Sequence, residues 1–146
     1  MTRRLKLDDY LPYRLSVASN AVSGLIAGAY QQQFGLTIPE WRLICVLAED
    51  GALTQAAIVT RTVMDKVTVS RAARSLVDKG LLARAENAGD GRSHLLTLSD
   101  EGRRVHGEVA PMALDYEARL LAGLSEDEVV QLKGLLRRLQ AGAEAD

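Results

Sequence analysis

Residues 65–104 read DKVTVSRAARSLVDKGLLARAENAGDGRSHLLTLSDEGRR, and this stretch decides the fold. Asp65 belongs to the residue types that cap helix N-termini. Gly80, after Lys79, is typical of a helix end that needs a left-handed residue. The stretch therefore predicts one helix from Asp65 to Gly80.

A β-hairpin is predicted directly after that helix. Leu81–Ala85 and Ser93–Leu98 are short, strand-like apolar segments. Ala88–Arg92, with Gly-Asp-Gly at its centre, has common turn chemistry and is expected at the tip. Ser99, followed by two acidic residues, predicts the N-cap of a long helix.

Two more helices are predicted before residue 65. Thr37-Ile38-Pro39-Glu40 is a capping box with proline in the first turn, and its helix should end at Asp50-Gly51. Thr54 is expected to cap a short helix. A short helix, a tight turn, a second helix and a hairpin together describe a winged helix-turn-helix over residues 37–98.

The helix after Asp65 has two unlike faces. One face is an apolar stripe that must be buried, formed by Val69, Ala72, Ala73, Leu76 and Val77. The opposite face carries Val67, Arg71 and Arg74, between Thr68, Ser70 and Ser75. Arginine pairs bidentately with guanine, hydroxyls reach phosphates or bases, and valine can contact a thymine methyl group. The ordinary alternative is an amphipathic helix whose outer face is only solvated.

The hairpin tip is suited to a DNA groove. Arg92 supplies a cation for a narrow, electronegative minor groove. Asp90 can orient that guanidinium or pair with Arg84 on the neighbouring strand, so we expect Arg84, Asp90 and Gly91 to shape the wing. A simple turn is the alternative. The residues expected to contact DNA are Thr54, Lys66, Val67, Thr68, Ser70, Arg71, Arg74 and Arg92.

Apolar seams predict helices at both ends of the chain. At spacings that alternate between four and three, the first seam consists of Leu11, Leu15, Ala18, Val22, Leu25 and Ala29. This seam predicts a first helix within residues 8–35 that ends near Phe34-Gly35. A second seam follows the capping box at Ser125, on the last helix of the region 99–142, and consists of Val129, Leu132, Leu136 and Leu139. Such stripes are association surfaces in a small chain, so we expect a homodimer.

Composition limits the classes of function. The 146 residues are 47% hydrophobic and 25% charged, as expected of a single globular domain over residues 1–146. Residues 54–104 carry nine Lys or Arg against six Asp or Glu, whereas the whole chain has a net charge of −1. This basic middle fits a polyanion. We expect a cytoplasmic protein without membrane, metal or cofactor, and no arrangement of nucleophile, base or paired carboxylates indicates an enzyme.

The run from Leu53 to Arg104 resembles the MarR (multiple antibiotic resistance regulator) family. The resemblance depends on LTQAAIVTRTVMDKVTVSRAARSLVDKGLLAR, on Asp90-Gly91-Arg92, and on LTLSDEG. It implies a mainly α-helical fold with a β-hairpin wing and dimerisation helices at both ends. It also implies a homodimer that binds a pseudo-palindromic operator in double-stranded DNA, usually as a repressor. Binding of a small molecule, often a phenolic or aromatic acid, is expected to release the homodimer from the DNA. Val63 departs from the family, in which many members carry glycine.

The effector site is left open by the sequence. Arg14, Asn20 and His106 are the polar side chains that could supply a donor to an anionic ligand, although for each of them a structural or solvated role is the stronger interpretation. Cys45, between Ile44 and Val46, is expected in the core and inert, which disfavours a redox-sensing regulator. A winged-helix module for protein contacts is the other alternative, and the salt dependence of binding would distinguish it from a DNA-binding protein.

Overall fold

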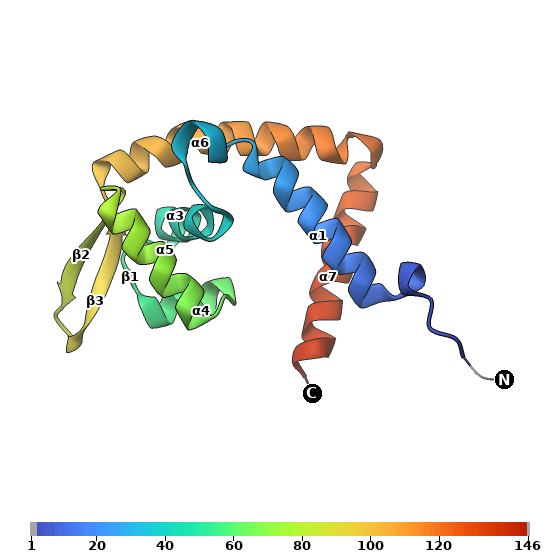
Figure 1. Cartoon of the computed structure of the whole chain (residues 1–146), viewed down its shortest axis with the longest axis horizontal. Helices are drawn as coiled ribbons and strands as arrows, with labels where there is room; N and C mark the ends of the chain where they lie inside the picture. The colour runs from blue at the N-terminus through green and yellow to red at the C-terminus, as the bar shows by residue number, and fades with distance from the viewer. Residues whose placement is uncertain (1–2, 146) are drawn as a thin grey trace.

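A computed structural model describes residues 3–145, except for the side chains of residues 90, 92 and 93. Figure 1 shows the arrangement of its helices around one small sheet. In chain order the elements are η1 (Leu7–Asp9), α1 (Leu11–Ala27), α2 (Gln31–Phe34), α3 (Ile38–Asp50), β1 (Leu53–Thr54), α4 (Gln55–Thr62), α5 (Lys66–Asp78), β2 (Leu82–Asn87), β3 (Asp90–Leu98), α6 (Asp100–Leu120), η2 (Leu121–Gly123) and α7 (Glu126–Glu144). The predicted fold class, mainly α-helical with a winged helix-turn-helix, is confirmed.

The predicted helix starts are confirmed by their caps. Thr37 and Glu40 form both hydrogen bonds of a capping box, as do Ser125 and Glu128. The side chains of Thr54, Asp65 and Ser99 each accept a hydrogen bond from a backbone amide in the first turn of their helix. These side chains satisfy amides that the helix itself leaves unpaired.

The hairpin differs from the prediction at its tip. The strands β2 and β3 are longer than expected, and Asp90 already pairs with Asn87. The turn is therefore confined to Ala88 and Gly89 instead of extending to Arg92. A third strand, β1, was not predicted, and it pairs with β3 to give the order β1-β3-β2. Two residues carry too little periodicity to identify a strand.

The first helix is not continuous to Phe34, so that prediction was wrong. The helix α1 ends at Ala27, the chain turns, and the short α2 begins at Gln31. Ala29 and Tyr30 in this turn are each only 2% exposed, because the bend directs them into the core. Burial of the Tyr30 side chain in the core stabilises the bent chain relative to a continuous helix. Ala29 is buried as well, so it does not belong to the exposed seam.

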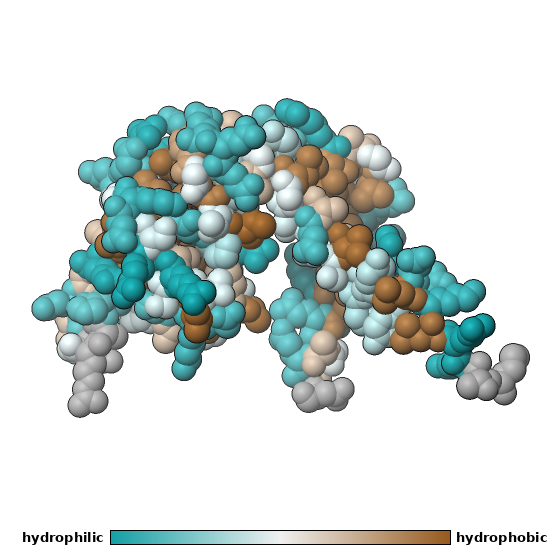
Figure 2. Space-filling model, in the orientation of Figure 1, coloured by the Kyte–Doolittle hydropathy of each residue, from teal (hydrophilic) through white to brown (hydrophobic). Residues whose placement is uncertain are grey.

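The long helix α6 connects two parts of the molecule. In Figure 1 the winged helix-turn-helix lies below the N-terminal half of α6, and α7 descends from the other end of α6. The helix α1 runs obliquely from beneath the middle of α6 towards the N-terminus. Figure 2 shows brown, apolar side chains on this second part. None of the described residues Glu126–Glu144 is buried, and the exposed apolar residues of α7 include Val130, Leu132, Leu135, Leu136 and Leu139.

Across residues 3–145 the helices are too short or too polar for any of them to span a bilayer.

Candidate functional site

The helix α5 presents one face to the core and the other to solvent. Val69, Ala73 and Leu76 are fully buried, in agreement with the predicted apolar stripe. The predicted DNA-contacting side chains Val67, Ser70, Arg71 and Arg74 are all exposed. Among them Val67 is 57% exposed although it is apolar. Exposed arginine and valine side chains are types that can contact base edges in a major groove.

The N-terminus of α5 is held by Asp65. This carboxylate accepts hydrogen bonds of 2.8 Å from both the amide and the hydroxyl of Thr68. Both hydrogen bonds lower the pKa of the Asp65 carboxyl group, and the one from the Thr68 amide has the larger effect. Thr68 is half-buried, and Lys66 is exposed beside the helix end. Lys66 thus lies where the helix N-terminus can approach a phosphate.

Thr54 caps α4, as predicted, and was also predicted to contact DNA. Its hydroxyl is half-buried and accepts a 3.1 Å hydrogen bond from the amide of Ala57, so it caps α4. A hydroxyl engaged in this way can still donate its proton to a phosphate, and the contact stays a prediction.

The turn between α4 and α5 contains Val63, the residue at which the sequence departs from the usual glycine. Val63 has φ 58° and ψ 23°, and its amide donates to the carbonyl oxygen of Val59. It is the one non-glycine residue with positive φ among those described. The turn therefore takes the left-handed geometry that glycine favours, at a cost in strain for a β-branched residue.

The wing places Arg84 on β2, exposed and opposite Leu96 in the register. The backbone of Gly91 belongs to β3. The side chains of Asp90 and Arg92 lie outside the described part of the structure, so their predicted roles stay predictions.

The wing is joined to α6 by Ser99 and Gly102. The hydroxyl of Ser99 donates a 2.6 Å hydrogen bond to the carbonyl oxygen of Gly80, and the Ser99 amide donates to that of Leu81. A Cβ atom on Gly102 would overlap the carbonyl oxygen of Leu81. This close approach explains why glycine stands at the end of the motif LTLSDEG: only a residue without a side chain lets α6 start against the first residues of the wing.

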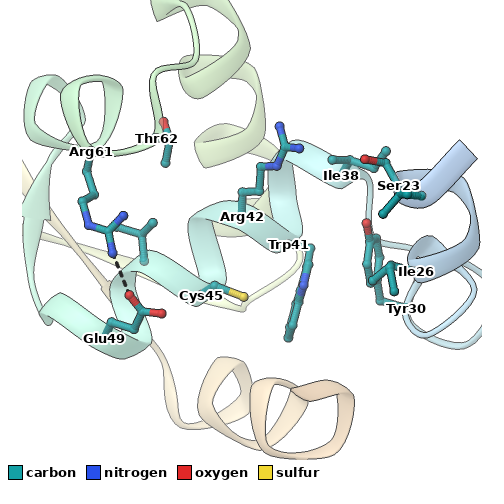
Figure 3. Close-up of a pocket in the computed structure, with 12 residues that line it drawn as sticks. Ser23, Ile26, Tyr30, Ile38, Trp41, Arg42, Cys45, Glu49, Arg61 and Thr62 are labelled. Carbon is teal, nitrogen blue, oxygen red and sulfur yellow. Dashed lines mark hydrogen bonds and ion pairs between the residues drawn. The ribbon is translucent and has the colours of Figure 1, made fainter. Parts of the chain in front are cut away.

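A pocket of about 440 Å³ lies between α1, α3 and the end of α4. Figure 3 shows Trp41, Arg42 and Cys45 on α3, facing Ser23 and Ile26 across the pocket. The other labelled residues are Tyr30, Ile38, Glu49, Arg61 and Thr62. Apolar and aromatic walls with a few charged groups are typical of small-molecule sites.

The charges of this pocket are unequally paired. The Arg61 guanidinium forms ion pairs of 2.7 Å with Glu49 and 3.2 Å with Asp50, which tie α4 to the end of α3. Arg42 forms no ion pair with any residue in the described part of the chain, and it is exposed. Of the two arginines that line the pocket, Arg42 is therefore the one whose guanidinium is not engaged by a carboxylate of the described residues.

Cys45 lines the pocket and is half-buried, so the prediction that it lies within the core was wrong. Burial, followed by the nearby Glu49 carboxylate, raises the pKa of its thiol to about 12. A thiol with that pKa is almost wholly protonated at neutral pH, which opposes reactivity.

The predicted effector residues are not brought together. Arg14 and Asn20 are exposed on α1, and His106 is stacked against Trp41, outside the pocket lining. Arg42 and Tyr30 were not predicted as pocket residues. The juxtaposed Trp41-Arg42 pair was the available signal, because an aromatic ring beside a guanidinium suits an aromatic anion.

Among residues 3–145, omitting the undescribed side chains, no group of three or more His, Cys, Asp or Glu has an arrangement that could hold a metal ion.

Known proteins resemble this chain in sequence and fold. A model of the MarR family matches residues 34–93. The transcriptional repressor MdtR of Bacillus subtilis is 31% identical over 112 residues, which cover 77% of this chain and 72% of that protein. A solved structure of a probable transcriptional regulator from Pseudomonas aeruginosa is 33% identical with a TM-score of 0.82, and the match covers 92% of this chain and 99% of that one. BpsR of Bordetella bronchiseptica, whose DNA binding is regulated by 6-hydroxynicotinic acid, is 25% identical with a TM-score of 0.87, and covers 94% and 98% of the two chains.

Proposed function

The chain belongs to the MarR family of transcriptional regulators, and from that premise we propose that it is a cytoplasmic repressor that binds operator DNA as a homodimer. One observation carries the DNA contact: the exposed face of α5 bears Val67, Ser70, Arg71 and Arg74, while its opposite face is packed in the core. Arg71 and Arg74 read bases in the major groove, and Arg92 enters the adjacent minor groove. The proposal includes no catalytic step.

Dimerisation is supported by α1 and α7. Leu11, Leu15, Val22 and Leu25 are between 38% and 48% exposed on α1, and α7 carries a comparable stripe. Apolar stripes of this length on two helices are covered in a stable protein, and a second copy of the chain offers the complementary surface. The dimerisation helices are thus those within 8–35 and 99–142, and light scattering should give twice the mass of the chain.

The effector is proposed to be a small aromatic acid that binds in the pocket of about 440 Å³. Arg42 would hold the carboxylate, and Trp41 and Tyr30 would contact the ring. BpsR supports this class, since its regulator 6-hydroxynicotinic acid is an aromatic acid. The pocket joins α1 to α3 and α4, so an occupant can change how the dimerisation helices are set against the DNA-binding module.

The experiment begins with DNA selected by the wild-type protein from a random-sequence pool. Selected sites should contain two half-sites about 10 to 11 base pairs apart, because a two-fold dimer places its recognition helices in successive major grooves. Arg71→Ala and Arg74→Ala should each weaken binding to the selected duplex by about 1–3 kcal/mol.

Arg138→Ala is the matched control, because Arg138 is exposed on α7 and its substitution removes the same charge from the protein. Equal losses on selected and shuffled duplexes for both α5 variants would remove the base-reading role. Duplex binding that does not weaken as salt rises would contradict phosphate contacts by the basic face.

A further inference from the structure

Glu40, in the first turn of α3, is a carboxylate in an unusual position. It is 3% exposed, and no other charged side chain is buried in the described part of the chain. A buried carboxylate destabilises a fold unless its oxygen atoms are hydrogen-bonded and its charge is compensated. The hydrogen-bond partners of Glu40 therefore indicate the structural role of its burial.

Both oxygen atoms of Glu40 are engaged. Oε1 accepts a 3.0 Å hydrogen bond from the amide of Thr37, which completes the capping box of α3. Oε2 accepts 2.9 Å from the hydroxyl of Ser75 and 2.8 Å from Nζ of Lys79. Lys79 also donates a 2.9 Å hydrogen bond to the carbonyl oxygen of Gly35. One oxygen atom thus serves α3, and the other holds α5.

A capping box by itself does not need this burial. Glu128 occupies the same position in the capping box of α7, where its Oε1 accepts a 2.8 Å hydrogen bond from Ser125 while the side chain remains exposed. The two boxes differ in that only Glu40 has partners on another helix. The tie to α5 is therefore an addition to the capping role.

The tie acts next to the base-reading residues. Lys79 directly follows α5 and keeps a helical backbone conformation, four residues after Ser75, so the two side chains lie on the same side of the C-terminal end of the helix. Two fixed points one turn apart restrain both the rotation of the helix about its axis and its distance from α3. Arg74 directly precedes Ser75, and Arg71 lines the same surface groove as Glu40 and Ser75.

We propose that Glu40 is a positioning residue for DNA recognition: by holding Ser75 and Lys79 it sets the rotation and depth of α5, and hence which base edges Arg71 and Arg74 reach. This inference rests on the proposed function. Glu40 itself contacts no DNA in this proposal. Its loss should reduce discrimination between sequences more than it reduces general attraction to phosphate.

The test compares Glu40→Gln with the wild-type protein on two duplexes, one selected by the wild-type protein and one shuffled to the same composition. We expect the preference for the selected duplex to fall roughly tenfold, the loss associated with a charge-assisted hydrogen bond. The slope of affinity against salt should stay that of the wild type, because no phosphate contact is removed. Glu128→Gln, the same change in the exposed capping box, should leave the preference unaltered.

A double variant separates positioning from stability. Glu40→Gln with Lys79→Met leaves no unmatched charge, so thermal stability should recover at least partly relative to Glu40→Gln alone. The preference for the selected duplex should stay low, because the link between position 40 and Lys79 is still absent. A preference that recovers together with the melting temperature would overturn the inference, as would a Glu40→Gln variant that discriminates like the wild type. A wild-type protein that prefers no duplex at all would instead overturn the proposed function, and the inference with it.

Discussion

The indole of Trp41 and the imidazole of His106 are stacked, with ring centroids 5.6 Å apart and planes inclined by 22°. Trp41 also stacks with Tyr30 at 5.5 Å. These contacts connect α3 with α6 and with the turn after α1. Because Trp41 and Tyr30 line the candidate effector pocket, an aromatic ligand there would contact the same group of rings.

The first prediction concerns ligand binding, with Trp41 as the probe, since it is the only tryptophan of the chain. Benzoate should change its fluorescence in a saturable way. Arg42→Gln should weaken benzoate about tenfold and leave the neutral analogue benzamide unaffected, because only the carboxylate needs the guanidinium. Arg14→Gln, on the exposed face of α1, is the matched control. Loss of benzoate affinity in that control alone would place the ligand elsewhere.

Gly102 should not tolerate a side chain. Gly102→Ala should lower the free energy of unfolding by about 2 kcal/mol or more, since its methyl group would displace either the start of α6 or the carbonyl group of Leu81. Gly107 lies on the same helix with nothing within 4 Å of an added Cβ. Gly107→Ala should therefore stabilise by about 0.5–1 kcal/mol. Urea unfolding measures both, and two changes of the same sign would contradict the packing described for Gly102.

Replacing Val63 by glycine should raise the stability of the fold. Its left-handed backbone costs a β-branched residue more than the entropy that glycine adds to the unfolded chain, so Val63→Gly should stabilise by about 1 kcal/mol. Gly80, with φ 75°, provides the reverse experiment. Gly80→Ala should destabilise by a similar amount in thermal unfolding. A lower melting temperature for Val63→Gly would show that the turn is not strained.

The Glu40 carboxylate should make the free energy of unfolding depend on pH in the acidic range. Burial acts to raise its pKa, but the hydrogen bonds from Lys79, Thr37 and Ser75 together outweigh burial, and the pKa lies below the ordinary value of 4.5. Its contribution to stability is therefore fully present above about pH 4.5 and is lost as pH falls through the lower pKa of the folded state. Glu40→Gln should be less stable than the wild type at pH 7, and the difference should shrink below about pH 4. A difference that is independent of pH would show that the charge contributes nothing.

Cys45 should react slowly with thiol reagents. A pKa of about 12 leaves little thiolate at pH 8, so a disulfide reagent should modify the native protein far more slowly than the unfolded chain. DNA binding should survive brief exposure to peroxide. Fast modification with loss of DNA binding would instead support a redox-sensing regulator.

Local signals in the sequence determined most of the secondary structure. Caps such as Thr37, Asp65, Ser99 and Ser125 are local chemistry, because each satisfies backbone amides within its own first turn. The two faces of α5 were predictable for the same reason: the apolar period alone fixes which side is buried. The exposure of Val67, Arg71 and Arg74 followed from that period.

Tertiary structure decided what depends on segments far apart in the chain. The bend after Ala27 occurs because Tyr30 gains burial among other helices, and no local pattern reports that gain. Position 102 must be glycine because the carbonyl oxygen of Leu81 lies against it. The buried charge of Glu40 is compensated by Lys79, which follows it by 39 positions in the chain. The pocket around Arg42 likewise needs α1, α3 and α4 in place. A sequence shows which residues can cap, bend or pair, but burial and charge pairing are energies between parts that only the folded chain brings together.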